Sequence, residues 1–216
     1  MVNGIWSAVA GRAVPSERDC QWKRRRAGDS APYHRSLHRA ALLALRRYAP
    51  IRARFVLTVS IAEQQMFLFE LNRQATGPSQ YEFRRAFLVS TSSFGTGQVI
   101  NSNQTPLGLH RIAEKIGGGQ PIGTIFRSRK AVGLTWQGTP EATIVHRIFW
   151  LEGLEPQFNR GGKVDTFRRY IYIHGFGDET TLGGPKSHGC IHMAANDLIP
   201  LFDRLPVGTL VWIGER

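Results

Sequence analysis

The stretch Phe55–Asn72, FVLTVSIAEQQMFLFELN, decides the fold class, because its apolar residues recur at every second position on both sides of a short polar segment. Alternation at a period of two is typical of half-buried β-strands, and both runs are rich in β-branched and aromatic residues. The polar AEQQ at 62–65 separates the runs by the length of a short turn. We therefore expect a β-hairpin here, with strands at Phe55–Ile61 and Met66–Asn72.

The rest of the chain repeats this pattern of short apolar runs separated by turns rich in Gly and Pro. Further strands are expected at Tyr81–Ser90, Pro106–Ile116, Glu141–Gly153, Arg168–Gly175 and Gly208–Glu215. The Ser/Gly/Thr/Asn-rich segment 90–105 reads as a long loop. Many short strands with few helical segments predict a mainly β fold of the sandwich or barrel type.

Two segments have helical rather than strand character. Residues 36–48 place Leu37, Ala41 and Leu45 near one face, which predicts a short amphipathic helix that ends before Pro50. The second segment is Asn196–Leu205. Pro200 has no N–H to donate and fits best in a first turn, so Asp197 is the expected N-cap of a helix of little more than two turns.

Positive charge is concentrated at the N-terminus. The formal net charge is +12, and residues 1–54 carry twelve Lys/Arg against three Asp/Glu. Such an arm could be attracted to an anionic surface such as nucleic acid, lipid or an acidic wall polymer. It could equally be a solvated, partly disordered tail. We divide the chain into a basic extension with a short helix, 1–50, and a catalytic-sized domain, 55–214.

Targeting signals are not evident in this sequence. No apolar run approaches the ~18 residues that a membrane-spanning helix needs. The first twenty residues, MVNGIWSAVAGRAVPSERDC, lack the basic start and the longer apolar block of a secretory signal. We therefore expect no transmembrane segment and identify no clear signal peptide.

The stretch Ser187–Met193, SHGCIHM, holds Cys190, one of only two cysteines, between two histidines. A thiol attacks well as thiolate, and its ordinary pKa of ~8.5 means that it needs a base or a positive potential nearby. His174 is the candidate base, because it ends the alternating run YIYIH. The carbonyl of Gly175 could hold one ring nitrogen as N–H and leave the other free for Cys190.

The turn before the cysteine could serve a second purpose. Glycine at 189 permits the tight backbone that aims consecutive amides inward. The amides of His188, Gly189 and Cys190 could therefore form an oxyanion hole, in which one donor is typically worth ~3 kcal/mol of barrier.

Two other interpretations of the cluster stay open. His174, His188, Cys190 and His192 are formally enough ligands for tetrahedral zinc, but H-x-C-x-H matches no usual zinc spacing, so we assign no metal site. Alternatively, the cysteine is a small buried apolar residue and the histidines are satisfied polar residues.

Taken together, YIYIHG and SHGCIHM resemble the signature of the L,D-transpeptidase catalytic domain family (YkuD type), H-G-(spacer)-S-H-G-C-[IV]-R-[ML]. VLTVSIAEQQMFLFE resembles the opening hairpin of that family. AFLVSTSSFGTGQVINSNQTPLGLHRI resembles its strand, loop and T-P-x-G segment, and LIPLFDRLPVGTLVWI resembles its closing helix and strand. The resemblance covers about residues 55–214.

The resemblance implies a β-sandwich-like fold with a cysteine acyl-transfer site and no cofactor. Cys190 would form a thioester with a peptidoglycan stem peptide, His174 would transfer protons, and the carbonyl of Gly175 would orient His174. The turn from Ser187 to Cys190, with Ser187, His188 and Gly189, would provide the oxyanion hole. An amine of a second stem would accept the acyl group. The alternatives are hydrolysis, as in an L,D-carboxypeptidase, or an inactive wall-binding module.

The family resemblance also implies partners and a place of action. The expected partner is the peptidoglycan stem peptide, in the cell envelope or periplasm, and no nucleic acid is expected. The family arginine two residues after the cysteine is His192 here. We expect a weaker, pH-dependent grip on a substrate carboxylate from His192, favoured by mild acid. His110 replaces a usual aromatic residue, and we expect it to fill a half-buried site.

Overall fold

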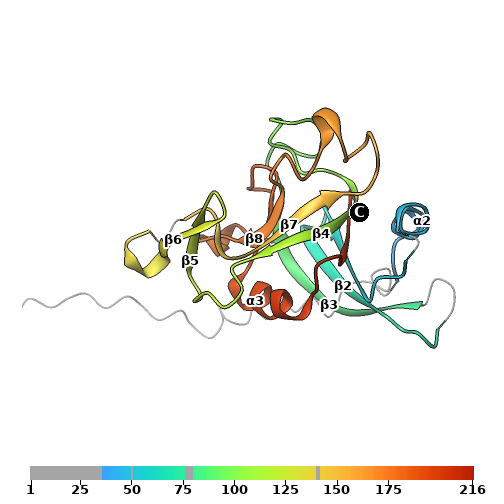
Figure 1. Cartoon of the computed structure of the whole chain (residues 1–216), viewed down its shortest axis with the longest axis horizontal. Helices are drawn as coiled ribbons and strands as arrows, with labels where there is room; N and C mark the ends of the chain where they lie inside the picture. The colour runs from blue at the N-terminus through green and yellow to red at the C-terminus, as the bar shows by residue number, and fades with distance from the viewer. Residues whose placement is uncertain (1–35, 50, 76–79, 140–141) are drawn as a thin grey trace, which may run out of the picture. The chain divides into compact units, whose positions relative to one another are not determined.

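The computed structural model describes residues 36–49, 51–75, 80–139 and 142–216 (Figure 1). The expected hairpin is present as β1 (Phe55–Ser60) and β2 (Gln65–Leu71), paired from Phe55↔Glu70 to Ser60↔Gln65. The other strands are β3 (Tyr81–Ser90), β4 (Gly108–Ile116), β5 (Thr124–Arg127), β6 (Lys130–Leu134), β7 (Val145–Gly153), β8 (Tyr172–Gly175), β9 (Ile191–Met193) and β10 (Leu210–Gly214).

The strands of the described residues form one ten-stranded sheet in the order β4-β10-β1-β2-β3-β9-β8-β7-β5-β6. β4 pairs with β10 and also with β7, so the sheet from β4 to β7 closes on itself. The β5–β6 hairpin lies outside this ring and is joined to β7. The predicted mainly β, sandwich-like fold with one or two short helices is confirmed: the described residues contain two helices and a single sheet that closes on its own first strand.

The main hydrophobic core consists of side chains on one face of the closed sheet. Leu57 and Val59 of β1, Ile173 of β8, and Ile191 and Met193 of β9 all point into it and are almost fully buried. Burial of such side chains contributes ~1.5–3 kcal/mol each. Because side chains alternate along a strand, the residues between them, including His174 and His192, lie on the opposite face.

Helix α2 (Arg39–Tyr48) covers the outer side of the sheet, as the sequence pattern predicted. It begins after His38, whose Nδ1 accepts a hydrogen bond from the Ala40 amide at 3.3 Å. Ala41, Ala44 and Leu45 are buried. Part of the predicted basic extension, residues 1–35 and Pro50, lies outside the described residues, and so does Cys20.

Helix α3 (Ala195–Arg204) begins earlier than predicted, and Asp197 is not its N-cap. Ala194 occupies that position, and the Ala195 amide donates to Glu179 Oε1 at 2.7 Å. Pro200 therefore lies inside the helix, where it removes one backbone hydrogen bond. Leu198, Leu201 and Phe202 are buried in the main core, and their packing offsets that loss.

The β5–β6 hairpin has no counterpart in the sequence analysis. Its turn residues Ser128 and Arg129 both have positive φ, 47° and 68°. Two-residue turns of this kind normally carry Asn-Gly or Asp-Gly, so Ser-Arg gives no recognisable hairpin signal. Three 3-10 turns, at Thr135–Gln137, Gly162–Val164 and Glu179–Thr181, complete the described elements. None of the helices in the described part of the chain is long and apolar enough to cross a membrane.

Candidate active site

The two predicted site segments lie side by side as the parallel strands β8 and β9. Their register pairs Ile173 with Ile191 and His174 with His192. Cys190 directly precedes β9 and is two residues from His192, so the alternation of side chains places it on the same face as both histidines. The sheet thus brings together residues that the sequence separates by sixteen positions.

His174 is buried, with 2% of its surface exposed, and its Nδ1 lies 2.7 Å from the Gly175 carbonyl oxygen. The carbonyl can only accept, so Nδ1 carries the proton and Nε2 presents a lone pair. Burial lowers the pKa of His174 to about 4, although the hydrogen bond to Gly175 opposes this shift. The ring is therefore a neutral base at pH 7.

Gly175 is required by packing as well as by its carbonyl. A Cβ at this position would lie 2.4 Å from Cδ2 of His146 and 2.7 Å from the Val145 carbonyl oxygen. His146, a buried residue with φ +70°, is held by a hydrogen bond from the Gly123 amide to its Nδ1 at 2.8 Å. The close approach of β7 and β8 thus admits only glycine beside His174.

Cys190 is half-buried, and its thiol donates a hydrogen bond to the Tyr170 carbonyl oxygen at a distance of 3.6 Å. Burial raises the pKa of the thiol to about 11, while the Tyr172 backbone amide and the Arg169 charge act in the opposite direction. The described hydrogen bond does not involve His174. The resting pair is therefore a neutral thiol and a neutral imidazole, rather than the ionised sulfur that the sequence analysis favoured.

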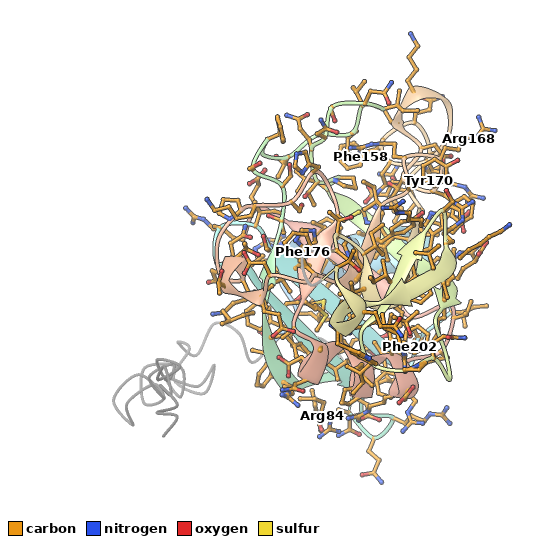
Figure 2. All side chains as sticks on the ribbon, turned by 90° about the vertical axis from the view of Figure 1, so that its left-hand side faces the viewer. Arg84, Phe158, Arg168, Tyr170, Phe176 and Phe202 are labelled. Carbon is orange, nitrogen blue, oxygen red and sulfur yellow. The ribbon has the colours of Figure 1, made fainter. Side chains whose placement is uncertain are left out.

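Tyr170, whose carbonyl oxygen accepts the hydrogen bond from the Cys190 thiol, lies in a turn. It has a positive φ of 56° and is 53% exposed, so it belongs to a turn and not to the strand predicted from Arg168. Figure 2 shows it near Arg168 and Phe158, among the loops on one side of the molecule. A non-glycine residue in this conformation is uncommon and clusters at functional sites.

Two of the four amides in the Ser187–Cys190 turn already have protein acceptors. The Ser187 amide donates to the Thr91 carbonyl at 2.9 Å, and the Gly189 amide donates to Ser187 Oγ at 3.2 Å. Ser187 Oγ in turn donates to the Cys190 carbonyl at 2.5 Å. Ser187 and Gly189 thus shape the turn, and within the described residues only the amides of His188 and Cys190 are left without an acceptor.

Thr105 supports the same turn from the long loop, a role that the sequence analysis missed. Its side chain is fully buried, and Oγ1 donates to the Gly189 carbonyl at 3.2 Å while accepting from the Ser92 amide at 3.0 Å. Gly189 has φ +116°, and a Cβ there would lie 3.2 Å from the Gln104 carbonyl oxygen. The T-P pair was the only sequence signal for this contact.

His192 lies under the site rather than on its surface. It is 6% exposed, stacks on Phe176 with centroids 4.4 Å apart, and its Nδ1 has no partner among the described residues. Burial, with the neighbouring His174 and His188, lowers the pKa of His192 to about 3. Since the ring stays neutral in mild acid, the expected strengthening of a carboxylate grip in that range is not supported.

The two other candidate histidines, His188 and His110, lie in separate surroundings. The His188 ring packs on Phe94, with centroids 5.4 Å apart. In the described part of the chain, no three His, Cys, Asp or Glu side chains form a group that could hold a metal ion. His110 is fully buried instead of half-buried, and its nitrogens contact the Gly108 carbonyl at 3.0 Å and Thr166 Oγ1 at 3.2 Å.

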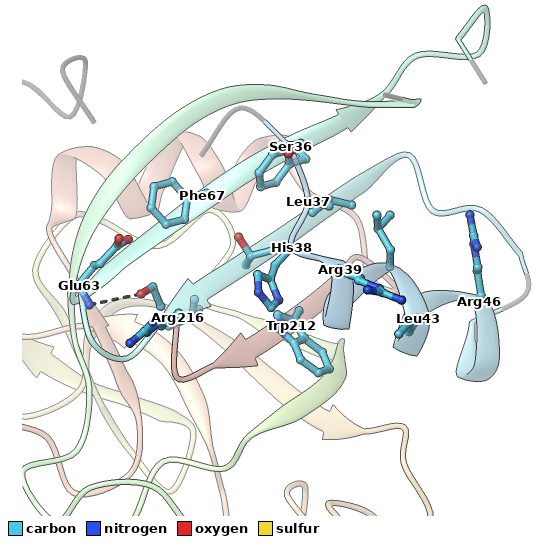
Figure 3. Close-up of a pocket in the computed structure, with 15 residues that line it drawn as sticks. Ser36, Leu37, His38, Arg39, Leu43, Arg46, Glu63, Phe67, Trp212 and Arg216 are labelled. Carbon is cyan, nitrogen blue, oxygen red and sulfur yellow. Dashed lines mark hydrogen bonds between the residues drawn. The ribbon is translucent and has the colours of Figure 1, made fainter. Parts of the chain in front are cut away.

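A cavity of about 990 Å³ is found elsewhere, between α2 and the outer side of β1, β2 and β10 (Figure 3). Its walls include Leu37, Leu43, Phe67 and Trp212, and none of the predicted site residues lines it. Size alone therefore does not indicate where the chemistry takes place, and the geometry around Cys190 is the better guide.

The family model of the L,D-transpeptidase catalytic domain (YkuD) matches residues 54–213. The chain belongs to this family. The matched range contains β1 to β10 almost entirely, together with the strands and the turn that carry His174 and Cys190. No curated protein matches the chain.

Solved structures similar to this chain share little of its sequence. The structure of Bdellovibrio bacteriovorus Bd1075 is similar with a TM-score of 0.50 at 16% identity, and the match covers 76% of this chain and 49% of that one. The LD transpeptidase LdtMt1 in complex with imipenem gives 0.45 at 15% identity, covering 74% and 59%. An L,D-transpeptidase from Mycobacterium smegmatis gives 0.43 at 15%, covering 75% and 59%. The chain thus spans about half to three-fifths of the length of these structures.

Proposed function

We propose that this L,D-transpeptidase family member is a cysteine acyltransferase that remodels peptidoglycan in the cell envelope. Cys190 is the nucleophile, and the acyl donor is a stem peptide. The observation that supports the proposal is the β8–β9 register, which pairs a buried, neutral His174 with His192, two residues after Cys190. The Gly175 carbonyl sets the tautomer of His174.

The first half-reaction starts from the neutral pair. The sulfur leaves the Tyr170 carbonyl and turns toward His174 Nε2, which takes the thiol proton as the sulfur attacks the donor carbonyl carbon. The carbonyl oxygen acquires the negative charge and is met by the free amides of His188 and Cys190. The carbon–nitrogen bond then breaks, and imidazolium returns its proton to the departing amine. The product is a Cys190 thioester.

The second half-reaction reverses these proton transfers. An acceptor amine loses a proton to His174 as it attacks the thioester carbonyl, and the sulfur leaves and recovers the proton. Water in place of the amine gives hydrolysis, the reaction of an L,D-carboxypeptidase. Product ratios at increasing concentrations of an added D-amino acid distinguish the two, since a hydrolase gives ratios that ignore the amine.

The thioester is tested by intact-protein mass spectrometry after incubation with imipenem or a tetrapeptide donor. We expect one adduct on the wild type and none on Cys190→Ala. The matched control is Cys20→Ala, which removes the only other cysteine and should keep the full adduct. Absence of any adduct on the wild type, or equal labelling of Cys190→Ala, contradicts the proposal.

A further inference from the structure

Arg169 is half-buried beside the site, and four acceptors of one loop hold its guanidinium. Nη1 donates to the carbonyl oxygens of Gly97 and Gln98, both at 2.9 Å. Nη2 donates to the Gln104 carbonyl at 2.6 Å and to Ser102 Oγ at 3.3 Å. A guanidinium that bridges both ends of a loop fixes its shape, because the donor fork is planar and rigid.

The same loop touches the turn that carries Cys190. The Gln104 carbonyl oxygen, which Arg169 binds, lies 3.2 Å from the position that a Cβ of Gly189 would occupy. The next residue, Thr105, donates its hydroxyl to the Gly189 carbonyl. The residue that follows Arg169 is Tyr170, whose carbonyl receives the thiol. Arg169 is therefore linked to the Cys190 turn through its side chain and through its own main chain.

The charge of Arg169 matters because the two buried histidines on the same face as Cys190 are neutral at pH 7. His174 and His192 are buried with pKa values lowered to about 4 and about 3. Burial raises the pKa of Tyr172, although the hydrogen bond and the charge of Arg129 oppose this shift. His188 stacks on Phe94, and Tyr170 is an exposed phenol. The guanidinium of Arg129 packs on the rings of Trp150 and Tyr170, with its Cζ 4.7 and 5.3 Å from the two ring centroids.

We propose that Arg169 is a positioning residue that fixes the loop Gly97–Gln104 over the Ser187–Cys190 turn and places a permanent positive charge beside the sulfur. It thereby supplies the cation that the family motif has at the position of His192. This inference rests on the proposed function only in taking Cys190 as the nucleophile. Its test uses thiol reactivity without any substrate, so the two proposals can fail separately.

The charge is tested by the pH dependence of alkylation of Cys190 by iodoacetamide, in a Cys20→Ala background, from about pH 7 to about pH 10. We expect Arg169→Gln to shift the profile to higher pH and to slow alkylation at a fixed pH by about fivefold. Arg169→Lys keeps the charge and should retain most of the wild-type profile. The matched control is Arg168→Gln, which makes the same charge change at an exposed neighbour.

The loop is tested by limited digestion with thermolysin, which cleaves before aliphatic residues such as the exposed Val99 and Ile100. Both Arg169→Gln and Arg169→Lys should be cut faster here than the wild type, since neither side chain reproduces the fork. If Arg169→Gln does not fold, the test rests on Arg169→Lys. Faster thermolysin cleavage of this variant supports the role of Arg169 in fixing the loop, and an alkylation profile close to that of the wild type supports the role of its charge. Equal profiles for Arg169→Gln and Arg168→Gln, or unchanged cleavage of both Arg169 variants, overturn the proposal.

Discussion

His174 and His192 face each other across the parallel strands β8 and β9, with ring centroids 4.8 Å apart at an interplanar angle of 60°. The His192 ring fills the space between the rings of His174 and Phe176. This space fits a flat neutral ring, and none of the described contacts of His192 is with a carboxylate that could pair with a cation. The position that carries an arginine in the family motif is therefore, in this protein, part of the packing beneath the base.

Restoring arginine at this position should harm the protein rather than improve it. We expect His192→Arg to lower the free energy of unfolding by about 2–4 kcal/mol, because a permanent charge would be buried without a partner. Urea unfolding followed by Trp fluorescence measures the change. His192→Phe, which keeps a flat ring, is the matched control and should lose less. A His192→Arg variant as stable as the wild type would show that the site accommodates the guanidinium.

Replacement of the base should remove the chemistry and leave the fold intact. His174→Gln is expected to slow acylation by imipenem by about a hundredfold or more, since the amide of glutamine cannot take the thiol proton. In the wild type, acylation should fall as the pH drops through about 4, where His174 becomes protonated. Stopped-flow acylation rates report both effects. His38→Gln, an exposed histidine at the start of α2, should react like the wild type.

The contact between β7 and β8 gives a stability prediction at Gly175. An alanine there would force its Cβ to within 2.4 Å of His146, so we expect Gly175→Ala to lower the free energy of unfolding by about 2 kcal/mol or more and to slow acylation. Thermal unfolding by circular dichroism measures the first effect. Gly133→Ala in β6, where a Cβ would meet nothing within 4 Å, should be close to neutral. Similar melting temperatures for the two variants would refute the steric explanation.

Buried histidines should make the protein sensitive to acid. The pKa of His110 is lowered to about 4 in the folded state, against ~6.5 when unfolded, so the unfolded chain binds a proton first as the pH falls. The stability that His110 contributes is present above about pH 6.5 and is lost between that pH and about pH 4, by up to ~3 kcal/mol. His174 and His192 act in the same direction.

His110→Phe tests this linkage. The variant should lose some stability at neutral pH, because the Gly108 carbonyl and Thr166 hydroxyl lose a partner, but its stability should fall less steeply in acid. Urea unfolding at a series of pH values gives the slope. The control His38→Gln, at an exposed histidine, should show the wild-type dependence of the free energy of unfolding on pH. If His110→Phe shows that same dependence, His110 is not a source of the acid sensitivity.

The sequence predicted the elements whose pattern is local. The alternation in Phe55–Asn72 and in YIYIHG is enough to place β1, β2 and β8, because burial of one sheet face imposes a period of two. The motif around Cys190 indicated the candidate site. Tyr170 was misplaced in a strand because its positive φ comes from the turn that follows Asp165, where the Arg169 amide bonds to the Asp165 carbonyl. No periodicity reveals such a turn.

Contacts between residues far apart in the sequence could not be predicted, for a different reason. Arg169 binds carbonyls some seventy positions away, and those acceptors are main-chain atoms that any residue would provide. Thr105 reaches Gly189 in the same manner. Pro200 inside α3 shows that burial of Leu198, Leu201 and Phe202 outweighs a local preference. These features depend on the closed sheet and not on neighbouring residues.

The position of β10 has a consequence for biosynthesis. This strand, the last to leave the ribosome among those described, lies between β1 and β4 and joins the two sides of the ring. A nascent chain that lacks Leu210–Gly214 has an open sheet with unpaired edges at β1 and β4, so closure of the domain must wait until β10 has been synthesised. Until then, the sheet that holds the residues around Cys190 is open, so we expect the site to form only after the last of the described strands has been synthesised.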